Sequence, residues 1–137
     1  MADLPTKALP QPTPLSAPYW QAAREGRLVV QRCAACGHAQ FYPRSLCTRC
    51  ASERLAFSEC SGRGRVRSFT VIRRAVSAAY EPELPYVVAL IELAEGPTLM
   101  SNVVGCAPEA LRIGAAVRVR FDAWTPELTV PVFTLES

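Results

Sequence analysis

The pattern of apolar and polar positions divides the chain into an irregular beginning and a long run of short strands. Residues 1–17 hold four prolines among small polar residues, a composition that predicts a flexible Pro-rich arm without a core of its own. Ser16 and Pro18 then provide a helix start, with serine as the cap, and Gly26 ends the helix. The apolar residues of this short helix, Tyr19 to Arg24, fall on one face. That face must be covered, either by the chain itself or by another subunit.

Alternation with a period of two predicts strands through the rest of the chain. The predicted strands cover residues 28–31, 40–43, 55–61, 65–74, 86–93, 98–104, 117–122 and 128–135. In the fourth of these, Phe69 and Val71 face one way while Val66, Ser68 and Thr70 face the other. A loop at 75–84 and a single helical turn at 108–111 interrupt the series. Short strands with one helical turn favour a small closed barrel, and an open sandwich is the alternative.

Two C-x2-C pairs, separated by ten residues, are the strongest chemical signal in the sequence. The four cysteines are Cys33, Cys36, Cys47 and Cys50. Two such turns can place four thiolates around one Zn²⁺ ion, with Zn–S distances of about 2.3 Å. Iron held as in rubredoxin, or simple redox pairs, are the alternatives. Four protein ligands leave no position for a substrate, so the predicted zinc is structural.

The residue after each C-x2-C pair tells how easily the two turns can form. Gly37 follows the first pair, where the chain needs a positive φ angle. Ala51 stands in the matching place after the second pair, so that turn is less suited to its conformation. The zinc ribbon that these strands and the two metal turns form is too small for a core, and we expect it to fold because the metal holds it.

Composition narrows the class of protein. The chain has 137 residues, half of them apolar, which suits one or two small domains. The net charge of +3 comes almost entirely from arginine, because Lys7 is the only lysine. We expect no leader and no membrane span, since no long apolar run is present. Six cysteines, four of them in metal spacing, favour a reducing cytoplasm.

A catalytic set is not evident. His38 is the only histidine, lies beside a predicted metal turn and is interpreted as a surface residue rather than a ligand or a base. The GRG at 62–64 is too short for a dinucleotide loop and predicts a bend that sharpens the barrel. Cys60 and Cys106 lack an activating base in the sequence, and each is interpreted as a small packing residue. We therefore predict no enzyme activity for this chain on its own.

Arginines form two groups with different interpretations. The candidates for binding the phosphates of an acyl-CoA are Arg63, Arg65, Arg67 and Arg73. Arg65, Arg67 and Arg73 share one strand parity and could form a basic edge, although a merely solvated face explains them as well. The second group, Arg32, Arg44 and Arg49, lies near the predicted thiolates, and screening of that negative charge is a sufficient explanation for it.

Four blocks together are more specific than any one of them: PYWQAAREGRLVVQRCAACGHAQFYPRSLCTRC, SGRGRVRSFTVI, PYVVALIEL and EALRIGAAVRVRF. In order and spacing they resemble the acyl-CoA-associated OB-fold family, over about residues 18–133. Many members have two prolines where this chain has Tyr42-Pro43, and Cys-Pro-x-Cys-Gly where it has Cys47-Thr-Arg-Cys50-Ala. These departures affect turns of the ribbon and leave the metal ligands in place.

The resemblance implies a mainly β protein with an N-terminal helix, a rubredoxin-like zinc ribbon and a five- to six-stranded OB-fold barrel. The implied domains are the arm at 1–17, the helix and zinc ribbon at 18–54, and the OB-fold domain at 55–137. It further implies a non-catalytic accessory subunit of a thiolase-fold enzyme, encoded beside it, whose chemistry is that of a thiolase, an acyltransferase or a retro-aldolase. The hetero-oligomer would bind or channel acyl-CoA at or near the interface.

The partner surface has four candidate residues, chosen because aromatic and large apolar side chains supply contact energy at interfaces. They are Tyr19, Trp20, Tyr80 and Leu84. A different class of function is a single-stranded nucleic-acid binder, because zinc ribbons and OB-folds both occur in such proteins. The small net charge and the few aromatic residues of the barrel weigh against it. A free-standing enzyme acting on CoA esters is the third reading. The sequence does not identify the acyl group or the stoichiometry.

Overall fold

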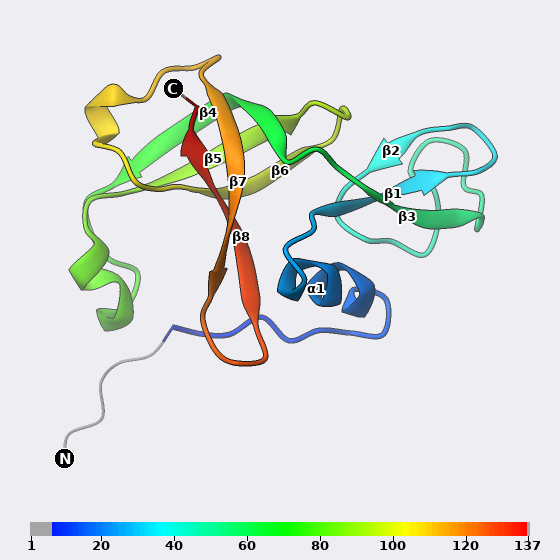
Figure 1. Cartoon of the computed structure of the whole chain (residues 1–137), viewed down its shortest axis with the longest axis horizontal. Helices are drawn as coiled ribbons and strands as arrows, with labels where there is room; N and C mark the ends of the chain where they lie inside the picture. Colours follow the sequence, from blue (N-terminus) through cyan, green and yellow to red (C-terminus); the bar gives the residue numbers. More distant parts are fainter. Residues whose placement is uncertain (1–6, 137) are drawn as a thin grey trace.

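A zinc-ribbon-like sheet and a β-barrel lie at opposite ends of an elongated molecule, with a short helix between them (Figure 1). The computed structural model describes residues 7–136. In chain order its elements are α1 (Ala17–Arg24), β1 (Val29–Cys33), β2 (Ala39–Gln40), β3 (Leu55–Glu59), β4 (Arg63–Ile72), η1 (Ala78–Glu83), β5 (Tyr86–Leu93), β6 (Thr98–Val103), η2 (Pro108–Ala110), β7 (Ala116–Ala123) and β8 (Thr129–Leu135). The predicted mainly β fold with an N-terminal helix is confirmed.

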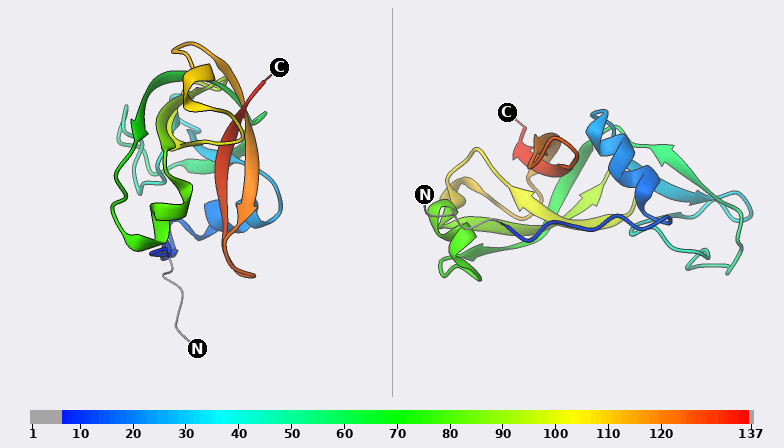
Figure 2. Two further views of the ribbon diagram at one scale, coloured as in Figure 1. Left: turned by 90° about the vertical axis from the view of Figure 1, so that its left-hand side faces the viewer. Right: turned by 90° about the horizontal axis from the view of Figure 1, so that it is seen from below.

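The N-terminal segment runs along the barrel before it enters α1 (Figure 2, right). Residues 1–6 of the predicted arm lie outside the described residues, so its flexibility stays a prediction. Within residues 7–136, no helix is both long enough and apolar enough to cross a membrane.

The helix begins where the sequence predicts, directly after Ser16 and with Pro18 in its first turn. Ser16 precedes α1 but does not cap it with its side chain. Instead Thr13 Oγ1 accepts a hydrogen bond from the Ser16 N–H at 3.1 Å, and Ser16 Oγ accepts one from the Thr13 N–H at 2.9 Å. This reciprocal pair closes a turn from Thr13 to Ser16, with Pro14 inside it, directly before α1. The sequence T-P-L-S therefore starts a turn that α1 continues.

The predicted stop of the helix at Gly26 is confirmed. Gly26 has a φ of +76°, and the Arg27 N–H donates to the Ala22 carbonyl at 2.9 Å. This bond satisfies a carbonyl that the last helical turn would otherwise leave without a partner.

The first sheet has the strand order β2-β1-β3, with both pairs antiparallel. β3 pairs with β1 from Val29↔Glu59 to Cys33↔Leu55, so it lies in the ribbon sheet rather than in the barrel. A domain is a part of the chain that can fold on its own, and strand pairing does not show this. The predicted domain boundary at 54/55 therefore stays a prediction.

Five strands close the barrel in the order β4-β5-β6-β8-β7, with β7 pairing back onto β4. Adjacent strands are antiparallel except β6 and β8, which are parallel at Val103↔Phe133 and close the barrel there. This five-stranded closed barrel with a helical turn, η2, before its fourth strand is an OB-fold. Gly64 approaches β5 so closely that an added Cβ would lie 2.8 Å from the Glu92 carbonyl oxygen.

A β-bulge in β4 overturns one detail of the sequence analysis. Val66 pairs with Ile91, but Ser68 pairs with Leu90, so Arg67 is the extra residue between them. The bulge resets the alternation: Val66 lies in the core and Phe69 packs against it on the same side. Residues before and after position 67 that share a parity therefore lie on opposite faces.

One apolar cluster runs from the ribbon through α1 into the barrel. Val29 and Val30 of β1, Tyr19 and Ala22 of α1, and the barrel interior around Phe133 belong to the same cluster. α1 contacts β1 on one side and β7 and β8 on the other. The helix face that required a cover thus packs against both regions of its own chain.

Candidate metal centre and partner surface

The four predicted ligands meet at the outer end of the ribbon. The Sγ atoms of Cys33, Cys36, Cys47 and Cys50 all lie within 4.8 Å of one another. The Sγ–Sγ distances are 3.6 Å both for Cys33–Cys50 and for Cys36–Cys47. A regular tetrahedron with Zn–S bonds of about 2.3 Å has edges of about 3.8 Å. The four cysteines are therefore positioned to bind one zinc ion as a closed, structural site.

The two metal turns repeat the same backbone hydrogen bonds. In the first, the Gly37 N–H donates to the Cys33 carbonyl at 2.9 Å; in the second, the Ala51 N–H donates to the Cys47 carbonyl at 2.9 Å. Gly37 has a φ of +79° and Ala51 a φ of +64°. An L residue with a Cβ pays about 1 kcal/mol or more for this conformation. The predicted misfit of Ala51 is confirmed.

Local backbone geometry prepares one ligand for its metal. A hydrogen bond from the backbone N–H of Cys36 lowers the pKa of the Cys33 thiol to about 6. The thiolate is the form that binds a metal ion. Zinc supplies a cross-link between the two turns, while the chain supplies the donors and their orientation.

Two buried glutamines, which the sequence did not single out, fix the loop between the metal turns. Gln31 and Gln40 are each 4% exposed and stand opposite each other on β1 and β2. Gln31 Oε1 accepts from the Arg44 N–H at 2.8 Å, and its Nε2 donates to the Arg44 carbonyl at 2.9 Å. Gln40 Oε1 accepts from the Thr48 N–H at 2.8 Å, and its Nε2 donates to Gln31 Oε1 at 2.9 Å. These side chains replace the backbone ladder that the two-residue β2 cannot provide.

Cys60 is unsuited to be a nucleophile. It is 9% exposed, and burial, followed by the nearby Glu95 carboxylate, raises its pKa to about 12. The thiol therefore stays protonated at neutral pH. This supports the interpretation of Cys60 as a packing residue at the junction of ribbon and barrel.

The barrel separates the arginines that the sequence grouped as phosphate candidates. Arg63 lies 3.8 Å from Glu136, Arg65 donates to the Gly114 carbonyl, and Arg67 donates to Thr98 Oγ1. Because of the bulge at Arg67, the prediction that three of them share one strand face is wrong. Arg73 follows the end of β4, about 30 Å along the strand from Arg63. Whether any of them binds a phosphate stays a prediction.

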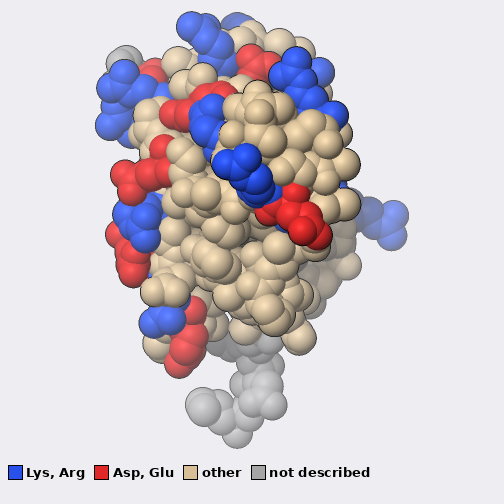
Figure 3. Space-filling view, turned by 90° about the vertical axis from the view of Figure 1, so that its right-hand side faces the viewer, with Lys and Arg blue, Asp and Glu red and all other residues tan. Residues whose placement is uncertain are grey.

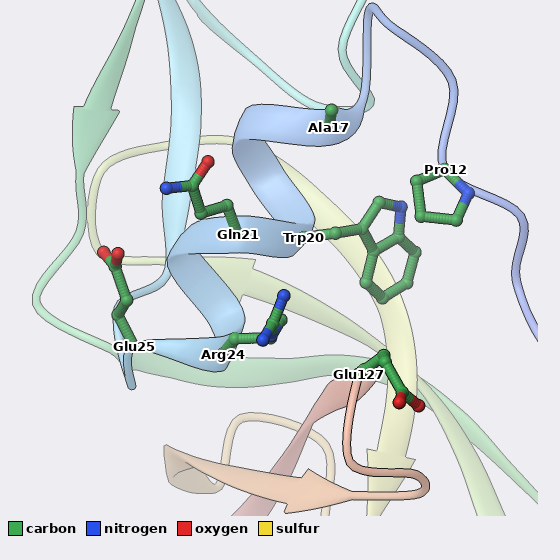
Figure 4. Close-up of a pocket in the computed structure, with 7 residues that line it drawn as sticks. All are labelled: Pro12, Ala17, Trp20, Gln21, Arg24, Glu25 and Glu127. Carbon is green, nitrogen blue, oxygen red and sulfur yellow. The ribbon is translucent and has the colours of Figure 1, made fainter.

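The two aromatic candidates on α1 have different environments. Tyr19 is only 8% exposed and packs between Trp20, at a ring distance of 4.9 Å, and Phe41, at 5.2 Å. The expectation of an exposed Tyr19 is therefore wrong. Trp20 is half-buried, and Figure 4 shows its indole projecting from α1 toward Pro12, with Glu127 of the β7–β8 turn nearby.

Tyr80 and Leu84, the other two candidates, lie in and just after η1 and are half-buried. The Tyr80 ring stacks on Tyr86 at 5.5 Å, and Lys7 Nζ lies 5.0 Å from its centroid. The same ammonium lies 4.6 Å from the Trp124 ring and 2.6 Å from Glu83 Oε2. We name these contacts the Lys7 clamp. It attaches the N-terminal segment to the barrel.

An apolar cleft of about 430 Å³ lies where α1, the ribbon loop and the barrel meet. Trp20, Tyr42, Met100 and Trp124 are among the residues that line it. Tyr42 is 48% exposed and Met100 57% exposed, and Leu90, the cross-strand partner of Met100, is 40% exposed. Exposed apolar side chains grouped in this way are candidates for an interaction surface. We name Tyr42, Leu90 and Met100 the waist surface.

Three of the barrel's aromatic residues are poorly placed for base stacking. Phe133 is fully buried, and Phe69 and Phe121 pack against the core. Figure 3 looks onto the ribbon end, where basic and acidic side chains lie interspersed, including near the centre of the view. A phosphate backbone is attracted by a continuous basic face, which this view does not show. Both observations weigh against the nucleic-acid alternative.

A closed four-cysteine ribbon and an OB-fold barrel, with α1 packed against both, define the class of protein: a zinc-ribbon OB-fold protein. Family models agree over most of the chain. The model described as "ChsH2, rubredoxin-like zinc ribbon domain" matches residues 20–56, and "ChsH2, C-terminal OB-fold domain" matches residues 58–122.

The chain belongs to this ChsH2-type DUF35 family. A "DUF35 domain-containing scaffold protein" of Methanothermobacter thermautotrophicus is 35% identical over 69% of this chain and 71% of that protein. A "probable enoyl-CoA hydratase alpha subunit" of Thermomonospora curvata is 43% identical over 84% of this chain. This chain spans 35% of the length of that relative.

Solved structures agree with the family assignment. A structure described as "Ltp2-ChsH2(DUF35) aldolase" superposes with a TM-score of 0.84 at 40% identity, over 93% of this chain and 98% of the matched chain. A DUF35 protein of Sulfolobus solfataricus superposes with a TM-score of 0.62 at 17% identity, over 90% of this chain and 86% of that one, and supports the fold alone.

Proposed function

We propose that this chain is a non-catalytic accessory subunit of an acyl-CoA-processing enzyme of the thiolase fold, in a hetero-oligomer. The observation that carries the proposal is the waist surface beside an apolar cleft, on a chain whose metal site is closed. A closed site holds structure and accepts no substrate, so the chemistry belongs to the partner.

The relatives support this reading of the surface. One is described as a hydratase alpha subunit, and a structural relative is part of an aldolase described by two components, Ltp2 and ChsH2. Both descriptions place a protein of this family beside an enzyme that acts in a complex. We infer that the thiolase-fold partner covers the waist surface, and that the acyl-CoA lies at or near that interface.

The chemistry of the cysteines fits the proposed location. Four cysteines positioned to hold zinc as thiolates, together with Cys60 and Cys106, which form no disulfide, suit a reducing compartment such as the cytoplasm. An oxidising compartment would compete for these thiols by disulfide formation.

The partner surface is tested with purified components. The chain is mixed with each thiolase-fold enzyme encoded beside it in its host, and complexes are measured by size-exclusion chromatography with light scattering. Met100→Glu combined with Tyr42→Ala should weaken the complex at least about tenfold, because a buried charge and a lost aromatic contact both oppose docking. Ile113→Glu is the matched control, since Ile113 is 71% exposed but lies outside the cleft.

Two outcomes contradict the proposal. If the wild-type chain binds none of these enzymes, the accessory-subunit reading is lost. If it binds one and the Met100/Tyr42 variant binds equally well, another surface makes the contact. An electrophoretic shift with single-stranded oligonucleotides that persists as salt is raised would favour the nucleic-acid alternative.

A further inference from the structure

A second cleft, of about 470 Å³, lies between the ribbon and the β5–β6 turn. Its volume falls in the range of about 300–1,000 Å³ that is common for small-molecule sites. Unlike the cleft at the waist, it is lined mainly by polar side chains. The ribbon contributes Arg32, His38, Arg44 and Arg49 to its lining.

The three arginines of this cleft come from three separate segments. Arg32 is on β1, Arg44 is in the loop after β2, and Arg49 is inside the second metal turn. Within residues 7–136, four arginines have a carboxylate within 4.0 Å, namely Arg27, Arg63, Arg118 and Arg120, while several arginines outside the cleft, such as Arg54 and Arg112, have none. None of the three cleft arginines has such a partner in the described part of the chain. Their guanidinium groups therefore remain available to an anion.

The frame of the cleft is fixed before any ligand arrives. The buried glutamines hold the backbone of Arg44 and of Thr48, and Thr48 also lines the cleft. Arg32 Nη1 donates to the Gly37 carbonyl at 3.1 Å, which orients that guanidinium. A preorganised site loses less conformational freedom when it binds.

Glu95 is the one carboxylate among residues 7–136 that lines the cleft, and its Oε1 is buried without a hydrogen-bond partner there. Glu95 Oε2 accepts a hydrogen bond from the Ser61 N–H at 2.9 Å. Burial alone would raise the pKa of Glu95, but hydrogen bonds that include the one from Ser61 hold it below its ordinary value. On the barrel side, Arg67 reaches Thr98, another lining residue, at 3.4 Å.

Charge balance with zinc explains why basic side chains lie near the thiolates, but it does not explain why three of them line one opening. Zn²⁺ with four thiolates carries a net charge of about −2, and the Glu95 carboxylate adds a negative charge to the same cleft. Arg54 also belongs to the ribbon and does not line the cleft. The position of three arginines around one opening requires a further explanation.

We propose that this cleft binds the phosphate groups of a CoA thioester, through Arg32, Arg44 and Arg49. Arginine forms paired hydrogen bonds to phosphate oxygens, and several guanidinium groups together suit a ligand with more than one phosphate. The inference rests on the proposed function, because that function supplies the CoA ester. It names the ribbon–barrel cleft, rather than the arginines of β4, as the site of the phosphates.

Isothermal titration calorimetry on the zinc-loaded full chain tests the proposal. The probes are CoA, adenosine 3′,5′-bisphosphate, dephospho-CoA and sodium sulfate, at matched ionic strength. We expect CoA and the bisphosphate to bind, dephospho-CoA to bind more weakly, and sulfate to bind little. Arg32→Ala combined with Arg49→Ala should raise the Kd for CoA at least about tenfold, because charged hydrogen bonds to the phosphates are lost. Arg54→Ala removes a charge from the same ribbon outside the cleft and should bind like wild type.

Zinc content and complex formation separate the possible failures. Equal binding of sulfate and CoA, or unchanged CoA binding in the Arg32/Arg49 variant, overturns the site. So does a variant that loses zinc together with CoA binding, because the arginines would then serve the metal. Suppose that the chain forms the complex with the thiolase-fold enzyme, yet does not bind CoA alone and does not depend on these arginines for CoA binding in the complex. In that case only this inference fails. If CoA binds as expected and no partner is found, the proposed function fails instead.

Discussion

The ribbon and the barrel of this chain are stabilised by different physical means. In the barrel, Ile91 and Phe133 are fully buried in a continuous apolar core. In the ribbon beyond β1, the side chains that are buried are polar or metal ligands, such as Gln40 and Cys47. Specific donors therefore substitute for apolar area where a segment is too small to exclude water. The consequence is that the two regions should respond to different perturbations.

Loss of a zinc ligand should produce the largest effect and confine it to the ribbon. Structural zinc binds with an apparent free energy of about 10–16 kcal/mol, which is folding free energy for a segment without a core. Cys47→Ser should abolish zinc binding and expose the amides of the ribbon around residues 33–54 to rapid hydrogen exchange. Metal analysis and exchange mass spectrometry measure both.

The same experiment tests the contrast between the two regions. Barrel amides in β5 and β8 should stay protected in the Cys47 variant. Cys106→Ser, which changes a cysteine outside the metal site, should keep one zinc per chain. Loss of protection in the barrel together with the ribbon would show a single cooperative unit.

A core truncation should act on the barrel. Phe133 is 0% exposed and pairs with Val103 where the barrel closes. Phe133→Ala should lower the free energy of unfolding by about 3–5 kcal/mol, from lost burial and the cavity left behind. Denaturant unfolding followed by circular dichroism measures this, and Leu135→Ala, at a half-buried position of the same strand, should cost less. Release of zinc from the native variant would contradict the separation of the two regions.

Removing one buried glutamine should weaken the ribbon by an intermediate amount. Gln40→Ala leaves the Thr48 N–H without its acceptor, at a cost of about 1–3 kcal/mol. Competition with a chelator should show weaker zinc retention, while the unfolding of the barrel stays unchanged. Gln21→Ala, on the exposed face of α1, is the control. Equal zinc retention in both variants would show that the glutamine network does not support the metal site.

The smallest effect should be a gain. Ala51 adopts a φ of +64°, which glycine reaches without the steric cost of a Cβ. Ala51→Gly should therefore stabilise the zinc-bound ribbon by about 1 kcal/mol. Ala35→Gly, in the first metal turn at a residue without positive φ, should give no gain. If the two glycines have the same effect, strain at Ala51 is not the cause.

The sequence predicted those features that depend on spacing and periodicity. The strand of residues 86–93, the turn at 108 and the metal ligands were all readable because neighbouring residues decide them. The bulge at Arg67 was not, since an extra residue in one strand shows only against its partner. The prediction that the arginines of β4 lie on one face was wrong for the same reason.

Features made by long-range contacts were hidden in the sequence as well. Gln31 and Gln40 read as ordinary strand residues, and only the fold shows that their side chains bind the backbone at Arg44 and Thr48. Tyr19 looked like a surface aromatic until α1 was seen to pack against both regions. The one sequence signal for this polar network was a glutamine on each strand of a short hairpin, at positions where an apolar residue would be expected.

The Lys7 clamp has a practical consequence for chemical labelling. Because Lys7 carries the only side-chain amine of the chain, an amine-directed reagent, cross-linker or acyl donor has a single side-chain target. That target sits between the Tyr80 and Trp124 rings and against Glu83. Acylation would neutralise the ammonium and remove both its cation–π contacts and its ion pair with Glu83. The labelling reaction itself would therefore weaken the attachment of the N-terminal segment. Cleavage by a lysine-specific protease, which has one site here, would report how often that segment detaches.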